Sequence, residues 1–356
     1  MFDFILKVCI EHFKGERTLS GIYNLLTGKR SSQTMQDAKG YNLDHYFGIF
    51  PSLKRNELDR HIEELLDLRE ISLENGGFPV LTAKGNKKLH DYDGPLLDSF
   101  QGMELHAAIP VFERRLNLLT QTATNLQADI TSFVPIIDDP EVQKWVKAVY
   151  ASVQQKIPQL VQSLHQEISQ LLAERSSIEA ELFAYRLSGG GVIGLTIEQL
   201  QNSFQLTRED VHICLFHMYH FLFWRAKRGQ ERYPVLHLCT KGLDSSHMIT
   251  QSAQKTYQYL NQGLSIEEVT TLRRLKRSTI QDHIVEAALV IPQFSIEPFI
   301  HPDDVDEILQ KARHLDTQRL KHIHEAFDGK YDYFELRLAM AGRQTQRKEG
   351  YAYDNS

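Results

Sequence analysis

Cysteine is scarce in this 356-residue chain, and the three that occur, Cys9, Cys214 and Cys239, lie far apart. Their spacing matches no zinc motif, and an odd number of cysteines fits a reducing cytoplasm better than a disulfide framework. No apolar run is long enough to cross a bilayer. The N-terminus lacks the basic segment and cleavage site of a secretory signal. We therefore expect a cytoplasmic protein without a membrane partner.

Sequence patterns of common enzymes are also missing. The chain has no Gly-x-x-x-x-Gly-Lys-Ser/Thr phosphate loop, and its glycine run at 188–191 follows no predicted strand, so this run is interpreted as a flexible joint. His217 and His220 have apolar neighbours, which favours packed or rim side chains over a zinc site. We predict a protein that is not an enzyme and has no cofactor or metal. A nuclease assembled from scattered acidic residues stays open as the alternative.

Positive charge is not in excess, because 40 Lys and Arg oppose 46 Asp and Glu, for a net charge of −6. This balance opposes attraction to nucleic acid as a whole. A local basic patch can still attract a phosphate, because salt screens the electrostatic interaction only beyond about 8–10 Å at ordinary ionic strength. Basic residues gather in 223–242 and acidic residues in 297–316. The sequence therefore predicts weak, salt-sensitive binding by local patches.

The region from Leu19 to Leu89 predicts a winged helix. A first helix and a basic loop precede an amphipathic helix over 53–66, whose apolar residues fall on one face. Two short apolar runs, 71–74 and 78–81, flank an Asn-Gly-Gly turn and predict a β-hairpin. Such domains lay a helix and a hairpin against nucleic acid, and others dock proteins. The candidate DNA contacts are Lys29, Arg30, Ser31, Ser32, Lys54, Arg55 and Arg60.

A long helical region follows over 100–187. Apolar residues repeat in steps of four and three from Leu105 to Phe133, and again from Val153 to Leu182. Residues 135–140 break the first run, and Pro158 should kink or divide the second. These patterns predict an antiparallel helical hairpin, with a homodimeric coiled coil as the alternative.

Residues 190–248 suggest a second winged-helix-like domain. The segment that begins with Tyr233 and Pro234 echoes the segment that begins with Phe78 and Pro79, which predicts a second hairpin. Trp224 and Tyr233 flank it, and they either stack on an unpaired base or anchor the hairpin to its own domain. The candidate DNA contacts here are Arg225, Lys227 and Arg228.

Residues 252–341 predict a C-terminal helix-turn-helix domain. Ser265 and an acidic first turn start one helix, and Ser278 opens the next. The residues expected to hold phosphates are Arg274, Lys276 and Arg277, and those expected to face a groove are Ser278, Thr279, Gln281 and His283. The polar residues 342–356 are predicted to be a flexible tail.

Two segments carry a resemblance to known families. The N-terminal residues 1–95 resemble the RQC winged helix of RecQ-family helicases, through the residues Ile22-Tyr23-Asn24-Leu25-Leu26-Thr27-Gly28-Lys29-Arg30-Ser31-Ser32, then Tyr46-Phe47-Gly48-Ile49, the 53–66 helix and residues 79–85. Residues 265–284 resemble the helicase-associated helix-turn-helix. The whole chain resembles the YpbB-like proteins of Gram-positive bacteria, helix-turn-helix proteins typically encoded next to a short RecQ-type helicase. The helicase motor and the four-cysteine zinc subdomain that precedes the module in RecQ helicases are absent.

The expected fold is mainly α, with winged-helix and helix-turn-helix domains, small β-hairpin wings and a long helical hairpin between them. The resemblance implies a non-catalytic DNA-binding accessory protein that partners a RecQ-type helicase in replication, recombination or repair. Two alternatives stay open: a helix-turn-helix transcription regulator, and a protein-interaction scaffold without DNA contact.

Overall fold

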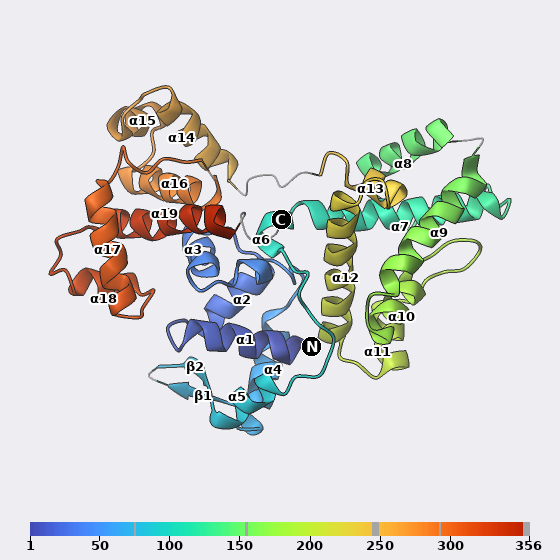
Figure 1. The fold of residues 1–356 in the computed structure, drawn as a ribbon, viewed down its shortest axis with the longest axis horizontal. Coiled ribbons are helices and arrows are strands. Elements are labelled where there is room, and N and C mark those ends of the chain that lie inside the picture. The colour runs from blue at the N-terminus through green and yellow to red at the C-terminus, as the bar shows by residue number, and fades with distance from the viewer. Residues whose placement is uncertain (75, 154–155, 244–248, 292, 352–356) are drawn as a thin grey trace. The chain divides into compact units, whose positions relative to one another are not determined.

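The computed structural model describes residues 1–356 apart from 75, 154–155, 244–248, 292 and 352–356, and it describes no side chains for 343–351. The chain divides into two compact units. The first unit contains Met1–Ile5, Ile49–Leu53 and Leu89–Ser246, and the second contains Leu6–Gly48, Lys54–Lys88 and His247–Ser356. Helices dominate both units, and the described residues form a single two-stranded sheet (Figure 1). The predicted mainly α fold is confirmed.

The N-terminal elements are α1 (Phe2–Phe13), α2 (Leu19–Thr27), α3 (Ser32–Gly40), the 3-10 helix η1 (Asp44–Tyr46), α4 (Arg55–Asp67), β1 (Ile71–Glu74), β2 (Phe78–Leu81) and α5 (Ala83–His90). The predicted hairpin is confirmed: β1 and β2 pair antiparallel, with Ile71 opposite Leu81. Gly76 and Gly77 both have positive φ in the turn, which glycine adopts without strain. Pro79 is tolerated because each strand of a two-stranded sheet is an edge.

The C-terminal elements are α14 (Gln251–Asn261), α15 (Ile266–Arg273), α16 (Arg277–Val290), α17 (Pro302–His314), α18 (Leu320–Glu325) and α19 (Tyr333–Tyr351). The central helix α16 packs on α14, α15 and α19. The two predicted helices of the helix-turn-helix, α15 and α16, are therefore present. The backbone of α19 continues beyond Gly342 as far as Tyr351, within the stretch that was predicted to be a flexible tail, and residues 352–356 lie outside the described part of the chain.

Within the second unit, the N-terminal and C-terminal elements pack on each other. Helix α3 contacts α16 and α19, and the Lys39 ammonium donates to the carbonyl of Leu289 near the end of α16. The loop after α1 receives residues 316–318: Glu16 accepts hydrogen bonds from the hydroxyl of Thr317 and from the backbone N–H of Gln318, the latter at 3.0 Å. Two parts of the chain that were predicted as separate domains thus share one packed unit.

The first unit contains α6 (Gly102–Leu105), α7 (Ala108–Gln127), α8 (Pro140–Val153), α9 (Ile157–Leu172), α10 (Ser177–Arg186), α11 (Ile197–Phe204), α12 (Arg208–Arg228) and α13 (Pro234–Thr240). Helix α7 lies within the predicted apolar repeat, and α8 and α9 pack along it (Figure 1). Pro158 lies in the first turn of α9, as its missing N–H permits. The second arm of the predicted helical hairpin is three helices, α8 to α10, and one division lies beside Pro158, where a kink or a division was predicted.

The predicted second hairpin is also wrong. Residues 208–228 form one continuous helix, and Pro234 starts α13 instead of an edge strand. Proline is favourable at such a helix start because its ring fixes a helical φ and its missing N–H has no helical partner. The apolar segment from Val211 to Phe223 is buried on almost all sides, so its side chains stabilise a central helix.

Candidate nucleic-acid interface

Helices α15 and α16 form the predicted helix-turn-helix in the second unit. Ser265 starts α15: its Oγ accepts from the N–H of Glu268 at 3.3 Å, and the Glu268 carboxylate accepts from the Ser265 N–H at 2.8 Å. Arg274 ends α15 in the left-handed region (φ 52°, ψ 40°), and Lys276 precedes α16. This three-residue turn fixes the direction of α16 relative to α15, which is what a groove-binding helix requires.

The first turn of α16 is the exposed part of this helix. Arg274, Lys276, Arg277 and Ser278 are exposed, and Thr279 is half-buried. The Lys276 side chain makes no cap hydrogen bond, so it does not compete with a ligand for the backbone N–H groups that start α16. Backbone N–H groups and the helix dipole favour an anion at such a terminus. The Arg277 guanidinium pairs with Glu267, but both side chains are more than half exposed. Exposed pairs contribute only about 0–1 kcal/mol, so a phosphate can replace the carboxylate.

Most of the remainder of α16 is buried. His283, predicted to face a groove, is only 8% exposed, and its Nδ1 lies 2.8 Å from the Thr256 hydroxyl. Burial, together with the charge of Arg273, lowers the pKa of His283 and keeps this ring neutral. His283 therefore stabilises the packing of α14 on α16. Gln281 is half-buried on the same helix.

The N-terminal basic loop joins α2 to α3. Gly28 ends α2 with a left-handed φ of 71°, and Lys29 and Arg30 follow as exposed residues. Ser31 has a structural role, since its Oγ accepts from the N–H of Thr34 at 3.2 Å and caps α3. Ser32 is half-buried in the first turn of α3.

Helix α4 carries the next three predicted contacts. Lys54 and Arg60 are exposed. Arg55 binds within the chain: its Nε lies 2.8 Å from Asp59 and its Nη1 lies 3.0 Å from the Ser20 hydroxyl. The pair with Asp59 is exposed, with 44% and 43% of the two side chains accessible, so it is weakly bound.

Sequence reasoning missed the basic side of α5, the helix that follows the hairpin. Lys87 and Lys88 are exposed there, while Lys84 donates to the carbonyl of Leu68 at 2.6 Å. Lysines at three- and four-residue spacing after a predicted wing were the available signal. The hairpin strands themselves carry no Lys or Arg and expose Leu73 and Glu74. The cationic residues of this region therefore lie on the helices beside the hairpin.

The predicted basic cluster of the first unit lies at the end of α12. Arg225 makes two hydrogen bonds to the carboxylate of Glu174, one of them at 2.9 Å, and Arg228 lies over the Trp224 ring at 4.6 Å. Lys227 is half-buried. Tyr233 is 2% exposed, so it anchors its own domain and offers no surface to a base. Arginines at this position also favour the negative end of the helix dipole.

A second helix-turn-helix hairpin, α11–α12, repeats α15–α16 residue by residue. Thr196 caps α11 through the N–H of Gln199 at 3.2 Å, as Ser265 caps α15. Gln205 ends α11 at φ 53° and ψ 41°, close to the values of Arg274, and one residue then separates each from the next N-cap. Leu200 and Val211 are fully buried, like their counterparts Val269 and Ile280. The shared signal was Leu195-Thr196-Ile197-Glu198 against Leu264-Ser265-Ile266-Glu267.

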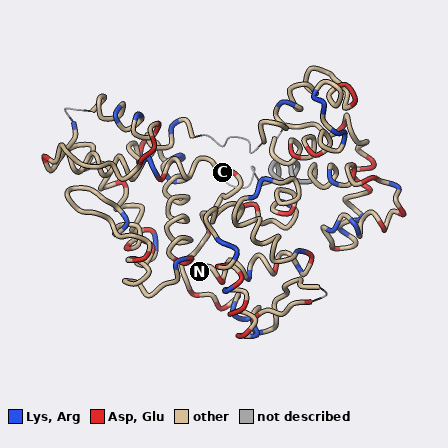
Figure 2. Tube along the Cα trace, turned by 180° about the vertical axis from the view of Figure 1, so that it is seen from behind, with Lys and Arg blue, Asp and Glu red and all other residues tan. Residues whose placement is uncertain are grey.

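The two helix-turn-helix hairpins differ in the first turn of their second helix, which is exposed in α16. Glu209 and Asp210 occupy the positions of Ser278 and Thr279, and Glu209 is 1% exposed. Asp210 accepts a hydrogen bond from the backbone N–H of Phe2 at 2.7 Å. An acidic first turn that binds its own chain does not suit a phosphate. Basic and acidic residues are interspersed along the helices of both units (Figure 2), so such local differences decide where an anion can bind.

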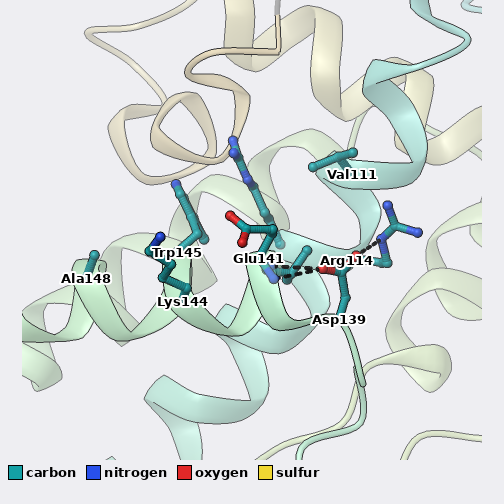
Figure 3. A pocket seen from close by; sticks show the side chains of 9 residues that line it. Val111, Arg114, Asp139, Glu141, Lys144, Trp145 and Ala148 are labelled. Atoms are coloured by element: carbon teal, nitrogen blue, oxygen red, sulfur yellow. Dashed lines mark hydrogen bonds and ion pairs between the residues drawn. The ribbon is translucent and has the colours of Figure 1, made fainter.

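A pocket on α7 and α8 shows how other arginines are used. Arg114 pairs with Asp139 at 3.5 Å at one end of the pocket, and Trp145 lies toward the other end (Figure 3). Arg115 lies over the Trp145 ring at 4.8 Å and donates to the carbonyl of Lys241 at 2.8 Å. These guanidinium groups therefore stabilise the packing of α7, α8 and the end of α13.

The two histidines of α12 that were predicted to be packed or rim side chains are packed. His217 and His220 are at most 1% exposed. The backbone N–H of Ser99 donates to Nε2 of His217 at 3.0 Å, and the N–H of Gln101 donates to Nδ1 of His220 at 3.3 Å. Both rings thus hold the segment before α6. The described residues contain no group of His, Cys, Asp and Glu that could hold a metal ion, and no described helix is long and apolar enough to span a membrane.

Comparisons with known proteins agree with this architecture. Residues 252–340 match the family model described as a helix-turn-helix domain. The chain is 28% identical over 349 residues to Protein YpbB of Bacillus subtilis (strain 168), covering 97% of this chain and 98% of that protein. No solved structure matches. The chain is therefore similar to YpbB over nearly its whole length, and its C-terminal part matches a helix-turn-helix domain.

Proposed function

We propose that this protein is a non-catalytic DNA-binding accessory of a short RecQ-type helicase, and that its second unit binds the DNA. The observation that carries the proposal is the exposed, cationic first turn of α16, with Arg274, Lys276 and Arg277 beside an N-terminus that lacks a side-chain cap. Phosphate contacts of this kind position a protein on a duplex without reading its sequence. The exposed Ser278 is the nearest candidate for a base edge.

The N-terminal part of the same unit supplies further cations. Lys29 and Arg30 precede α3, and α3 packs on α16. Because both parts belong to one packed unit, we expect them to engage a single duplex at a fixed spacing. The exposed Lys87 and Lys88 of α5 extend the basic surface beside the hairpin.

Support for the helicase comes from two resemblances. Residues 1–95 resemble the RQC winged helix of RecQ-type helicases, and their predicted hairpin is present as β1 and β2. The chain is similar over nearly its whole length to YpbB, and the resemblance to YpbB-like proteins implies a short RecQ-type helicase as the partner. In this proposal the chain supplies in trans the duplex-binding modules that the short helicase lacks, during replication, recombination or repair.

DNA binding is tested with a labelled duplex at several salt concentrations. We expect Lys276→Ala/Arg277→Ala to weaken binding, and to lower the slope of log affinity against log salt by roughly one unit per lost phosphate contact. Arg208→Ala is the matched control, because Arg208 holds the position of Arg277 in the α11–α12 hairpin. Equal binding by the double variant and wild type would remove α16 from the interface.

The helicase role is tested separately. Unwinding of a forked duplex by the purified short RecQ-type helicase is measured with and without this chain. We expect the wild-type chain to increase unwinding and the Lys276→Ala/Arg277→Ala variant to increase it less. If the chain neither binds the helicase nor changes its unwinding, the partnership is excluded, whereas DNA binding would still stand on the preceding measurement.

A further inference from the structure

Two loops of the first unit expose a cluster of apolar side chains that the proposed DNA contacts do not use. Val134 is 86% exposed in the loop between α7 and α8, and Ile193 is 85% exposed in the loop between α10 and α11. Ile136 and Val192 beside them are 42% and 67% exposed. Isolated apolar residues are common on protein surfaces, but apolar residues gathered together mark an interaction site.

The two loops meet on one stretch of α7. The Gln121 amide accepts from the N–H of Ile136 at 2.9 Å and donates to the carbonyl of Val134 at 3.1 Å. Gly189 of the second loop lies directly on the same turn, since a Cβ there would come within 3.3 Å of the Gln121 Cα. One turn further, Asn125 Oδ1 accepts from the N–H of Gly191 at 3.2 Å. Both amide side chains are buried, so they fix the loops firmly.

Residues 188–194 are a tight turn and not the flexible joint that the glycine run predicted. Gly189 and Val192 exchange two backbone hydrogen bonds, at 2.9 and 3.0 Å. Gly190 and Gly191 between them have φ of 59° and 81°, as in the two-residue turns of β-hairpins. The Ser188 hydroxyl accepts from the N–H of Gly194 at 2.9 Å. The turn therefore holds Val192 and Ile193 outward with little conformational entropy left to lose on binding.

The charge around these loops favours a cationic partner over nucleic acid. No Lys or Arg occurs in residues 128–139 or in residues 187–207. The adjoining Arg186 and Arg114 are bound within the chain, to the carbonyl of Leu195 at 3.0 Å and to Asp139 at 3.5 Å. Exposed acidic side chains are present instead, at Asp129, Asp138 and Glu198. A surface of this composition repels phosphates and attracts Lys and Arg.

We propose that these two loops form a docking surface for a protein segment that carries apolar side chains flanked by Lys or Arg. The apolar side chains of the segment would cover Val134, Val192 and Ile193, and its cations would lie against the acidic rim. Identification of the segment as part of the helicase rests on the proposed function. Under this assignment the first unit binds protein and the second unit binds DNA.

The test measures the affinity of the full chain for the purified short RecQ-type helicase. Val134→Asp/Ile193→Asp should weaken this affinity at least tenfold, because two apolar contacts are lost next to an acidic rim. Both side chains are almost fully exposed, so the variant should fold, and an unchanged urea-unfolding transition of tryptophan fluorescence, a signal that comes from the first unit, checks this. Ile193→Leu should bind like wild type, and Leu73→Asp is the matched control on an exposed apolar residue of the other unit.

The outcomes separate the docking surface from the proposed function. If wild type binds the helicase and the Val134→Asp/Ile193→Asp variant binds it equally well, the docking surface is wrong and the helicase partnership stands. If wild type does not bind the helicase, both are wrong as stated. Asp129→Lys/Asp138→Lys should also weaken binding, and the difference from wild type should shrink as salt is raised. An unchanged affinity of this charge variant at low salt would contradict a cationic occupant.

Discussion

Glu16 and Gln318 are joined by a hydrogen bond, 3.0 Å long, from the backbone N–H of Gln318 to the Glu16 carboxylate. The same carboxylate accepts from the hydroxyls of Tyr41 and Thr317, so it satisfies three donors at once. These residues connect the loop after α1 to the segment before α18. The contact joins the winged-helix part of the second unit to its helix-turn-helix part.

Removal of this carboxylate should therefore destabilise the second unit as a whole. Glu16→Ala leaves the donors of Tyr41, Thr317 and Gln318 without their acceptor, and we expect a loss of about 1–3 kcal/mol in the free energy of unfolding. Far-UV circular dichroism in urea measures it. Lys14→Ala is the control: it breaks only the exposed pair with Asp316 and should cost about 0–1 kcal/mol. Equal losses in the two variants would show that Glu16 has no special part in the packing.

Ser31 should affect folding and not DNA affinity. Its hydroxyl caps α3, so Ser31→Ala should lower the free energy of unfolding by about 1 kcal/mol. Ser31→Asp retains an acceptor at the N-cap and should restore most of it. Duplex affinity, measured well below the unfolding transition, should be the same in all three proteins. A large loss of affinity in the folded Ser31→Ala variant would return this residue to the predicted DNA contacts.

A substitution at Arg274 should lower DNA affinity without destabilising the fold, which is the opposite of the effect expected at Ser31. A non-glycine residue with left-handed backbone is strained, so Arg274→Gly should stabilise the folded protein by up to about 1 kcal/mol. The same variant removes a cation from the exposed turn before α16, so duplex affinity should fall. Gln205→Gly makes the same backbone change in the α11–α12 hairpin and should stabilise without any effect on affinity. Arg274→Gly with full DNA affinity would show that this guanidinium contacts no phosphate.

The sequence predicted local elements well where a cap, a turn and periodic apolar residues agree. The β1–β2 hairpin has its glycine turn and two apolar runs, and α16 follows a capped helix at the expected spacing. The error at Pro234 has a physical cause. The likeness to Pro79 covered a few residues, but Pro79 follows a glycine turn, whereas Pro234 follows a long apolar helix and is well suited to start another.

Contacts between distant segments could not be predicted from the pattern. Periodicity shows that α3 and α16 each bury a face, but it does not say that they bury it against each other. At His283, by contrast, the sequence did contain the answer. This residue lies three residues after Ile280 and one before Ile284, both fully buried. These spacings put His283 on the core side of α16, so helical periodicity contained the information that excluded it from a groove.

His220 should make the first unit less stable in mild acid. Burial, together with the charge of nearby His217, lowers the pKa of His220 to about 3. In the unfolded chain an ordinary histidine titrates near pH 6.5, so below that pH the unfolded state takes up a proton that the folded state does not. The stability from this group is therefore present above about pH 6.5 and is lost as pH falls toward 3, by up to about 1.4 kcal/mol per pH unit.

Urea unfolding at pH 7.5 and pH 5 tests this, with tryptophan fluorescence as the signal, since both tryptophans, Trp145 and Trp224, belong to the first unit. His220→Asn keeps an acceptor for the Gln101 N–H but cannot titrate, so its stability should change less with pH than that of wild type. The Glu179 carboxylate does not add to the change in stability between pH 7.5 and pH 5. Burial raises its pKa, but hydrogen bonds from His217, Arg175 and Ser176 outweigh burial and lower the pKa to about 2, so its contribution is lost only below about pH 4.3. The same pH dependence in wild type and His220→Asn would contradict the neutral, buried ring that the hydrogen bond from Gln101 requires.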